Sequence, residues 1–128
     1  MISENLQIIK EKIAKTCNFC GRNPAEITLI AVSKTRPAAE IKELFEAGHI
    51  DFGENKAQEL KLKAESLSLP LSWHMIGHLQ TNKVKYIIEH AEYIHSVDSL
   101  KLAEEINLKA AKLNKVQRIL LEVNTSGE

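Results

Sequence analysis

A lysine stands just beyond an apolar segment in the stretch LIAVSKTRP, residues 29–37. Leu29 to Val32 are four consecutive apolar residues, which predicts a strand buried on both faces. Lys34 follows two residues later, shortly before Pro37, a residue type favoured at the start of a helix. An ammonium group is a poor helix cap because it offers no acceptor to the amides, and the positive end of a helix disfavours it. Its position therefore suggests a chemical role.

The chemistry that suits such a lysine is nucleophilic attack on a carbonyl group. A lysine that is partly desolvated and close to positive potential has a lowered pKa. Its neutral amine then forms a Schiff base with an aldehyde or ketone. The residues around Lys34 predict this environment, but they do not name the carbonyl compound. The alternative is a lysine that only extends its charge from the rim of a sheet into water.

Other residues with polar or reactive side chains follow the remaining predicted strands. The residues at these strand ends are Ser33 and Lys34, Glu54 and Asn55, Gly77 and His78, Ser96 and Asp98, and Asn124 and Ser126. If the strands are parallel, their carboxyl ends face one common mouth. Loops after strands are also polar because they cap helices, and Asp98 or Ser99 is expected to be such a cap.

Neither the histidines nor the cysteines have the spacing of a metal site. His74, His78 and His95 show no ligand-type spacing. Cys17 and Cys20, in CNFC, end a predicted helix instead of following a strand, as a thioredoxin-like pair would. One CxxC pair also supplies only half of a four-ligand zinc site. We therefore expect no metal.

Strand and helix patterns alternate along the chain after a first amphipathic helix at residues 3–19. Strands are expected at 27–33, 50–53, 72–77, 93–97 and 117–124, and helices between them at 37–47, 55–66, 81–90 and 98–113. This alternation is typical of an α/β fold with a parallel sheet and right-handed crossovers. No flexible linker interrupts it, so residues 1–128 are expected to form a single domain.

Two architectures fit this alternation, an open doubly wound sheet and a (β/α)8 barrel of the TIM type. The first strand-to-helix turn, SKTRPAA, has no glycine, so the dinucleotide-binding fingerprint is absent. An eight-stranded barrel needs about 250 residues. The 128 residues and five predicted strands would be a little over half of one.

Composition argues against nucleic-acid and membrane partners. The chain has 17 basic and 17 acidic residues, so its net charge is zero, and a nucleic-acid-binding surface is not expected. No apolar run approaches the roughly 20 residues that span a bilayer. The first residues, MISENLQIIKEK, lack the apolar centre of a signal peptide. A cytoplasmic protein is the simplest expectation.

Five short motifs resemble one known family. They are AVSKT at 31–35, FGENKAQE at 52–59, WHMIGHLQTNK at 73–83, IHSVDS at 94–99 and LLEVNTSGE at 120–128. In this order and spacing they resemble the pyridoxal phosphate homeostasis protein family, which is related to the N-terminal barrel domain of alanine racemase. The resemblance covers the chain from Glu26 onward. It implies the N-terminal portion of a pyridoxal-phosphate-binding (β/α)8 barrel, truncated after about five strands.

The resemblance also implies roles for individual residues. Lys34 would form a Schiff base with pyridoxal 5'-phosphate, and Asn55 would lie near this cofactor. Lys56 stands where the family commonly has an aromatic residue or arginine. The phosphate group is held in the family by residues of late strands, which would follow Glu128. The family is thought to bind and supply pyridoxal phosphate within the cell and to keep free aldehyde low, and it is not known for efficient turnover.

Two other functions stay open. One is a pyridoxal-phosphate-dependent enzyme similar to an amino acid racemase, which needs an acid or base on each face of its substrate. Lys34 would serve one face, and the sequence offers no strong candidate for the other. The second is a half-barrel with no independent activity. Whether the chain is an enzyme is therefore left open by its sequence.

The first and last strands of such a part-barrel would both be open edges. Open edges and uncovered apolar surface favour association between chains. We therefore expect self-association through these edges.

Overall fold

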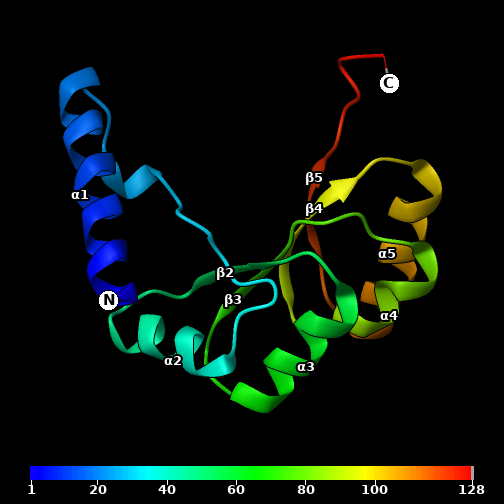
Figure 1. Ribbon diagram of the computed structural model, residues 1–128. Coiled ribbons are helices and arrows are strands. Elements are labelled where there is room, and N and C mark those ends of the chain that lie inside the picture. Colours follow the sequence, from blue (N-terminus) through cyan, green and yellow to red (C-terminus); the bar gives the residue numbers. More distant parts are fainter. Residues whose placement is uncertain (128) are drawn as a thin grey trace.

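The computed structural model describes residues 1–127 and shows the predicted alternation of strands and helices. After α1 (Ile2–Cys20) and the 3₁₀ turn η1 (Pro24–Glu26) come the strands β1 (Ala31–Val32), β2 (Asp51–Glu54), β3 (Ser72–Met75), β4 (Ala91–Val97) and β5 (Arg118–Leu121). The elements between them are α2 (Ala38–Glu46), α3 (Ala57–Leu67), the 3₁₀ turn η2 (Thr81–Lys83), α4 (Val84–Ile87) and α5 (Leu100–Lys112). Figure 1 shows their arrangement.

The five strands form one parallel sheet in the order β1-β2-β3-β4-β5. One row of paired residues crosses the whole sheet, from Val32 through Gly53, His74 and Tyr93 to Arg118. The spatial order never reverses, whereas a doubly wound sheet has a point at which it does. The α/β class with a parallel sheet is therefore confirmed, and the strand order is that of a (β/α) barrel.

Helices α2 to α5 lie along the convex side of the curved sheet (Figure 1). The core between them and the sheet is apolar because alternate strand residues point to this side. It contains Phe52, Trp73, Met75 and Ile94 from the strands and Ile41, Leu60, Val84, Ile87, Leu102 and Ile106 from the helices. Each such side chain stabilises the fold by about 1.5–3 kcal/mol when it is fully buried. This packing fixes the curvature of the sheet and the positions of its strand ends.

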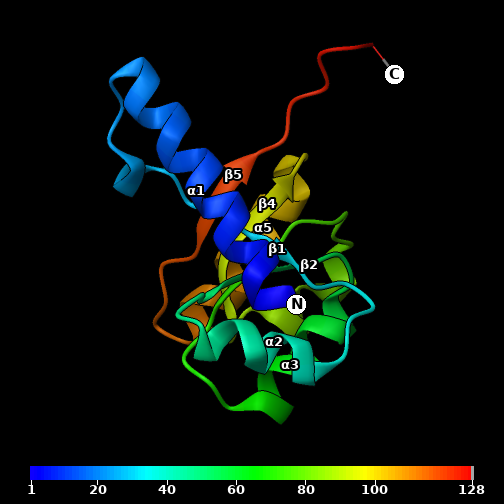
Figure 2. The same ribbon diagram turned by 60° about the vertical axis from the view of Figure 1, so that its left-hand side comes forward.

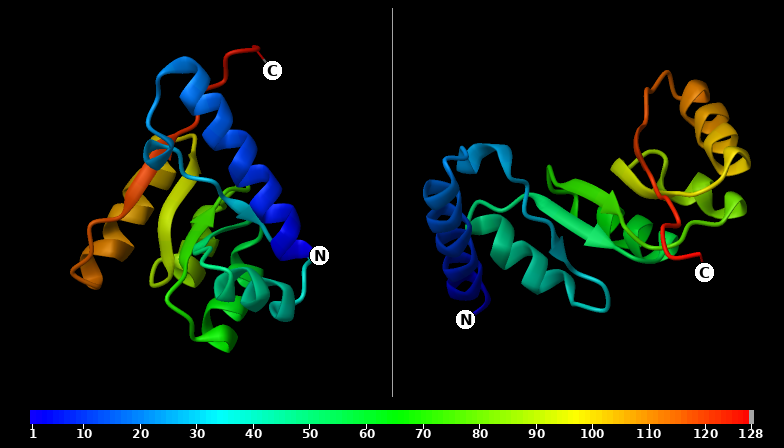
Figure 3. Two further views of the ribbon diagram at one scale, coloured as in Figure 1. Left: turned by 90° about the vertical axis from the view of Figure 1, so that its left-hand side faces the viewer. Right: turned by 90° about the horizontal axis from the view of Figure 1, so that it is seen from above.

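The concave side of the sheet is not covered by any helix or strand within residues 1–127 (Figure 3, right). Helix α1 lies at the β1 end of the sheet, where it packs against α2 (Figures 1 and 2). Leu6 joins α1 to the core. No other element of the described chain therefore lies over the side chains that point to the concave side.

The first strand differs from its prediction. Only Ala31 and Val32 form β1, and Val32 is 53% exposed although we expected a segment buried on both faces. Leu29 and Ile30 are only half-buried. The reason is that β1 pairs with β2 alone and that its concave face is uncovered. Strand β5 is the other edge, and the expected self-association through these edges stays a prediction.

The helix expected at 81–90 is also shorter than predicted. It consists of η2 followed by the four-residue α4. Strand β4 already begins at Ala91, which leaves no room for a longer helix, and Val84 and Ile87 still bury its apolar face completely. At the next helix, Ser99 is the cap, since its Oγ accepts the Leu102 amide at 3.1 Å.

None of the helices in the described part of the chain combines the length and the apolar character needed to cross a bilayer.

Candidate functional site

Lys34 lies in a tight turn that follows β1. The amide of Arg36 donates to the carbonyl oxygen of Ser33 at 3.0 Å and closes the turn. Thr35 has φ 61°, in the left-handed region. This conformation is uncommon for a β-branched residue and costs about 1–3 kcal/mol, so surrounding contacts must hold it. The turn that carries Lys34 therefore depends on contacts with other parts of the chain to keep its conformation.

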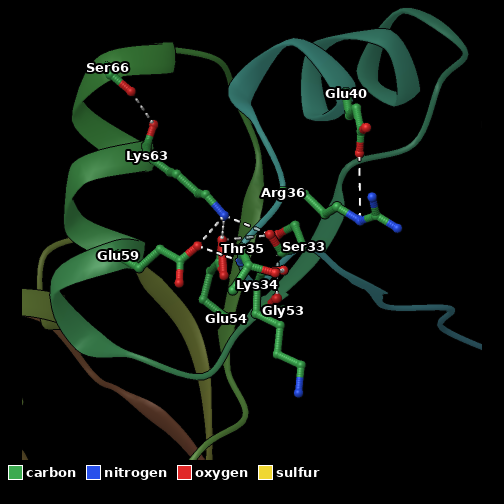
Figure 4. Close-up of polar contacts among 10 residues, drawn as sticks. All are labelled: Ser33, Lys34, Thr35, Arg36, Glu40, Gly53, Glu54, Glu59, Lys63 and Ser66. Atoms are coloured by element: carbon green, nitrogen blue, oxygen red, sulfur yellow. Dashed lines mark hydrogen bonds and ion pairs between the residues drawn. The ribbon is translucent and has the colours of Figure 1, made fainter.

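The side chain of Lys34 points away from the polar contacts around its turn (Figure 4). It is exposed, and within residues 1–127 no carboxylate pairs with its amine. The partial desolvation that we expected is therefore not observed, because the neighbouring concave side is uncovered. The amine is accessible to a carbonyl compound that approaches through the mouth.

Lys63 of α3 holds the backbone of this turn. Lys63 is 8% exposed, and its ammonium group donates to the carbonyl oxygen of Ser33 at 2.6 Å. It also donates to Oε1 of Glu54 and, at 2.7 Å, to Oε2 of Glu59. The same Glu59 oxygen accepts the amide of Thr35 at 2.7 Å. These contacts are drawn in Figure 4 and use all three ammonium protons.

We did not predict Lys63 or Glu59 from the sequence. The available signal is their i,i+4 spacing in α3, with the glutamate first, which favours an ion pair on a helix. That signal is common on solvated helices and does not indicate burial. The contact with Ser33 joins residues that are 30 positions apart, and only the folded sheet brings them together.

The pKa values of the two glutamates that contact Lys63 are shifted in opposite directions. Burial raises the pKa of Glu54, against the opposing effects of Lys63 and the Ser33 hydroxyl. The side chain of Glu54 is fully buried, and its Oε2 has no hydrogen-bond partner within the described chain. Burial also raises the pKa of Glu59, but the hydrogen bonds from Lys63 and the Thr35 amide outweigh it and lower that pKa overall. Glu59 is therefore held in its charged, hydrogen-bond-accepting form.

Asn55 lies at the carboxyl end of β2, beside the loop that follows β3. A Cβ atom added to Gly77 would lie 2.3 Å from the carbonyl oxygen of Asn55 and 2.8 Å from its Cα. The two loops are therefore in direct backbone contact, and only glycine fits at position 77. A recess next to them is lined by both loops, including Asn55, Lys56, His78 and Lys83. The sheet thus brings Asn55 to the mouth, as predicted from the strand ends.

Four side chains on the concave side of the sheet form a connected group. His74 Nδ1 lies 3.0 Å from His95 Nε2, and His74 Nε2 lies 3.0 Å from Oδ1 of Asp51. The Tyr93 ring stacks on His74, with ring centroids 5.6 Å apart and planes 4° apart. His78 is separate and lies near Asp98, at 3.9 Å. The described residues contain no group of three or more His, Cys, Asp or Glu suited to a metal ion.

Burial lowers the pKa of His95, and the charge of His74 lowers it further. The folded protein therefore binds fewer protons at this site than the unfolded chain does. The stability that His95 contributes is complete above the unfolded pKa of about 6.5 and is lost as the pH falls through that value toward the folded pKa.

We expect His95→Gln to reduce the loss of stability between pH 7.5 and pH 5. The measurement is the free energy of unfolding in urea as a function of pH. His78→Gln is the control, since the side chain of His78 is 71% exposed and should leave the slope unchanged. Some slope will remain in His95→Gln because burial also lowers the pKa of His49. Equal slopes in His95→Gln and the wild type would contradict the prediction.

The remaining strand-end residues are Ser96 and Asp98, at the end of β4, and Asn124 and Ser126, which follow β5. Ser96 is buried at the end of β4, and Asp98 is exposed. Asn124 Oδ1 accepts the amides of Ser126 and Gly127 and so organises a turn of its own. This last segment extends away from the sheet (Figure 1). The structure thus places Lys34 at the end of β1, and Asn55 and His78 together beside one recess at the ends of β2 and β3.

Sequence comparison places this arrangement in a known family. Residues 3–128 match the family model described as "Alanine racemase, N-terminal domain". Pyridoxal phosphate homeostasis proteins of Pseudomonas aeruginosa and Aquifex aeolicus are 44% and 45% identical to the chain. The matches cover 99% and 98% of this chain, but 56% and 55% of those proteins. The chain thus spans about half the length of the curated relatives it matches.

Solved structures give the same result. PipY of Synechococcus elongatus, solved with pyridoxal phosphate bound, has a TM-score of 0.82 and 38% identity, over all of this chain and 57% of PipY. A structure of an unknown protein from Bifidobacterium adolescentis has a TM-score of 0.89 and 34% identity, over 99% of this chain and 56% of that protein. With its parallel five-stranded sheet and its match over residues 3–128, the chain belongs to the alanine racemase N-terminal domain family, and its predicted resemblance to pyridoxal phosphate homeostasis proteins is confirmed.

Proposed function

We propose that this chain binds pyridoxal 5'-phosphate through a Schiff base with Lys34 and takes part in pyridoxal phosphate homeostasis. The observation that carries the proposal is the exposed, unpaired amine of Lys34 at the mouth of the sheet, in a chain whose relatives bear that name. PipY, which was solved with pyridoxal phosphate bound, supports the choice of cofactor.

The residues in the mouth fit the aldehyde end of this cofactor. Bound pyridoxal phosphate supplies an aldehyde that condenses reversibly with an amine. Lys34 provides the amine, and its turn is held by Lys63 and Glu59. Asn55, on the neighbouring strand end, is positioned to contact the cofactor through its side-chain amide, which both donates and accepts hydrogen bonds. The phosphate end would contact residues of the strands that follow β5 in the family.

The test is to mix the purified chain with pyridoxal phosphate, reduce it with borohydride and locate the adduct by peptide mass spectrometry. A single stoichiometric pyridoxyl adduct on Lys34 is expected. Adducts spread over the surface lysines, or no adduct at all, would contradict the proposal for this chain.

We further propose that residues 1–128 form one domain, the N-terminal portion of the barrel. We also propose that the protein acts in the cytoplasm without a nucleic-acid partner. Cys17 and Cys20 are both free thiols, which suits a reducing compartment. The balance of 17 basic and 17 acidic residues supports the absence of a nucleic-acid partner.

A further inference from the structure

Lys63 is connected to the backbone on both sides of Lys34. On the N-terminal side it donates directly to the carbonyl oxygen of Ser33. On the C-terminal side it acts through Glu59, whose Oε2 accepts both the Lys63 ammonium and the Thr35 amide. Lys34 is the residue between these two attachment points. Its own side chain takes no part and points the other way (Figure 4).

The position of Lys63 is unusual for a lysine that serves stability alone. It is 8% exposed in a helix whose buried face is otherwise built from residues such as Leu60 and Ala57. An apolar residue of similar volume would often be at least as stabilising as a buried ion pair. What an apolar residue cannot do is donate to a backbone carbonyl and hold a carboxylate against a backbone amide. The contacts of Lys63 with Glu54 and Glu59 therefore serve to hold the turn in one orientation.

The turn needs such support because Thr35 is held in the left-handed region and Lys34 is exposed. Without it, the backbone at Thr35 would relax toward a commoner conformation. A long lysine side chain on a relaxed turn would present its amine in many directions. Holding a nucleophile in a reactive orientation before the encounter is a general source of rate.

We propose that Lys63 is a positioning residue for Lys34. Together with Glu59 it fixes the Ser33–Arg36 turn and so directs the Lys34 amine into the mouth, where it meets the carbonyl carbon. Lys63 does not contact the aldehyde. This inference rests on the proposed function, because Lys34 must be the amine that reacts.

The main test uses Glu59→Ala, which leaves the buried pair between Lys63 and Glu54 in place and so is expected to fold. Removing a charge-assisted hydrogen bond should raise the exchange rate of the Thr35 amide hydrogen by about tenfold. The rate of borohydride-trapped adduct formation at Lys34 should fall by about the same factor. Glu59→Gln keeps an acceptor for the Thr35 amide. Its amide exchange rate at Thr35 and its rate of adduct formation at Lys34 should therefore lie between those of Glu59→Ala and the wild type. The control is Glu65→Ala in the same helix, where Glu65 pairs with Lys61 away from the turn.

Lys63→Met is the second variant, and it removes the hydrogen bond to the Ser33 carbonyl oxygen and the ion pair with Glu59. Circular dichroism should first show that it is folded, and amide exchange is then compared between Thr35 and residues of the core strands. Glu59 still accepts the Thr35 amide in this variant, so we expect an exchange rate at Thr35 between those of the wild type and Glu59→Ala, together with slower trapping at Lys34. If this variant does not fold, Glu59→Ala alone decides the test.

The outcomes separate this inference from the proposed function. Absence of a Lys34 adduct in the wild type would overturn the proposed function. A wild-type adduct that forms at the same rate in Glu59→Ala would overturn only the positioning role of the cluster. An unchanged exchange rate of the Thr35 amide hydrogen in Glu59→Ala would also overturn the positioning role. Faster exchange with slower trapping, and neither effect in Glu65→Ala, would support it.

Discussion

Lys34→Ala is expected to abolish covalent attachment of pyridoxal phosphate, whereas Lys56→Ala is expected to leave it intact. Both lysines are exposed and lie at neighbouring strand ends. Only Lys34 is carried by a turn whose backbone is fixed on both sides. Lys56 is the residue before α3 and lines the recess beside Asn55. The measurement is the stoichiometry of the pyridoxyl adduct after borohydride reduction, with each adduct assigned by peptide mass spectrometry.

Lys34→Arg provides a second comparison at the same position. It keeps the positive charge, but the guanidinium group stays protonated and cannot act as the amine nucleophile. A Schiff base requires an amine, so Lys34→Arg should be as inactive as Lys34→Ala. Equal loss of the adduct in Lys34→Ala and Lys56→Ala would rule out a specific role for Lys34. An adduct retained at full stoichiometry in Lys34→Arg would have the same consequence.

Gly77→Ala is expected to destabilise the protein and to displace Asn55. The added Cβ would meet the carbonyl oxygen, the Cα and the carbonyl carbon of Asn55, all within 2.9 Å. These are backbone atoms, so no side-chain rotation relieves the clash. The loss should reach about 3 kcal/mol, the upper part of the range for overpacking. Urea unfolding measures the loss, and the chemical shift of the Asn55 side-chain amide reports the displacement.

Gly48→Ala is the matched control for this substitution. Nothing lies within 4 Å of a Cβ at position 48, and only its φ of +94° opposes the change. We expect a loss of about 1–2 kcal/mol from the backbone conformation, with no change at Asn55 or in adduct formation at Lys34. A loss in Gly77→Ala no larger than in Gly48→Ala, with an unmoved Asn55, would show that the two loops separate easily.

The topology and the position of Lys34 could be predicted because both follow from local signals. Alternating strand and helix patterns dictate a parallel sheet, and a parallel sheet collects its carboxyl ends on one side. The exposure of Val32 could not be predicted in this way. A run of apolar residues indicates a strand suited to burial, but it does not say whether each face is covered. The partial desolvation expected for Lys34 was wrong for the same reason.

The support of the turn could not be predicted either. Lys63 and Glu59 look like an ordinary surface pair on a helix, and Ser33 looks like a polar loop residue. Their connection depends on how α3 packs over the ends of β1 and β2, which is a property of the assembled sheet. The strain at Thr35 is equally invisible in the sequence, since threonine carries no preference for the left-handed region.

The contacts of His74 also decide where the hydrogens of two rings lie. A carboxylate only accepts hydrogen bonds, so a neutral His74 must carry its proton on Nε2, toward Asp51. Its Nδ1 is then an acceptor, and a neutral His95 must donate from Nε2. Nδ1 of His95 is consequently the bare nitrogen. Asp51 thus selects the tautomer of a ring that it does not touch, and through it the atom at which the concave side of the sheet can act as a base.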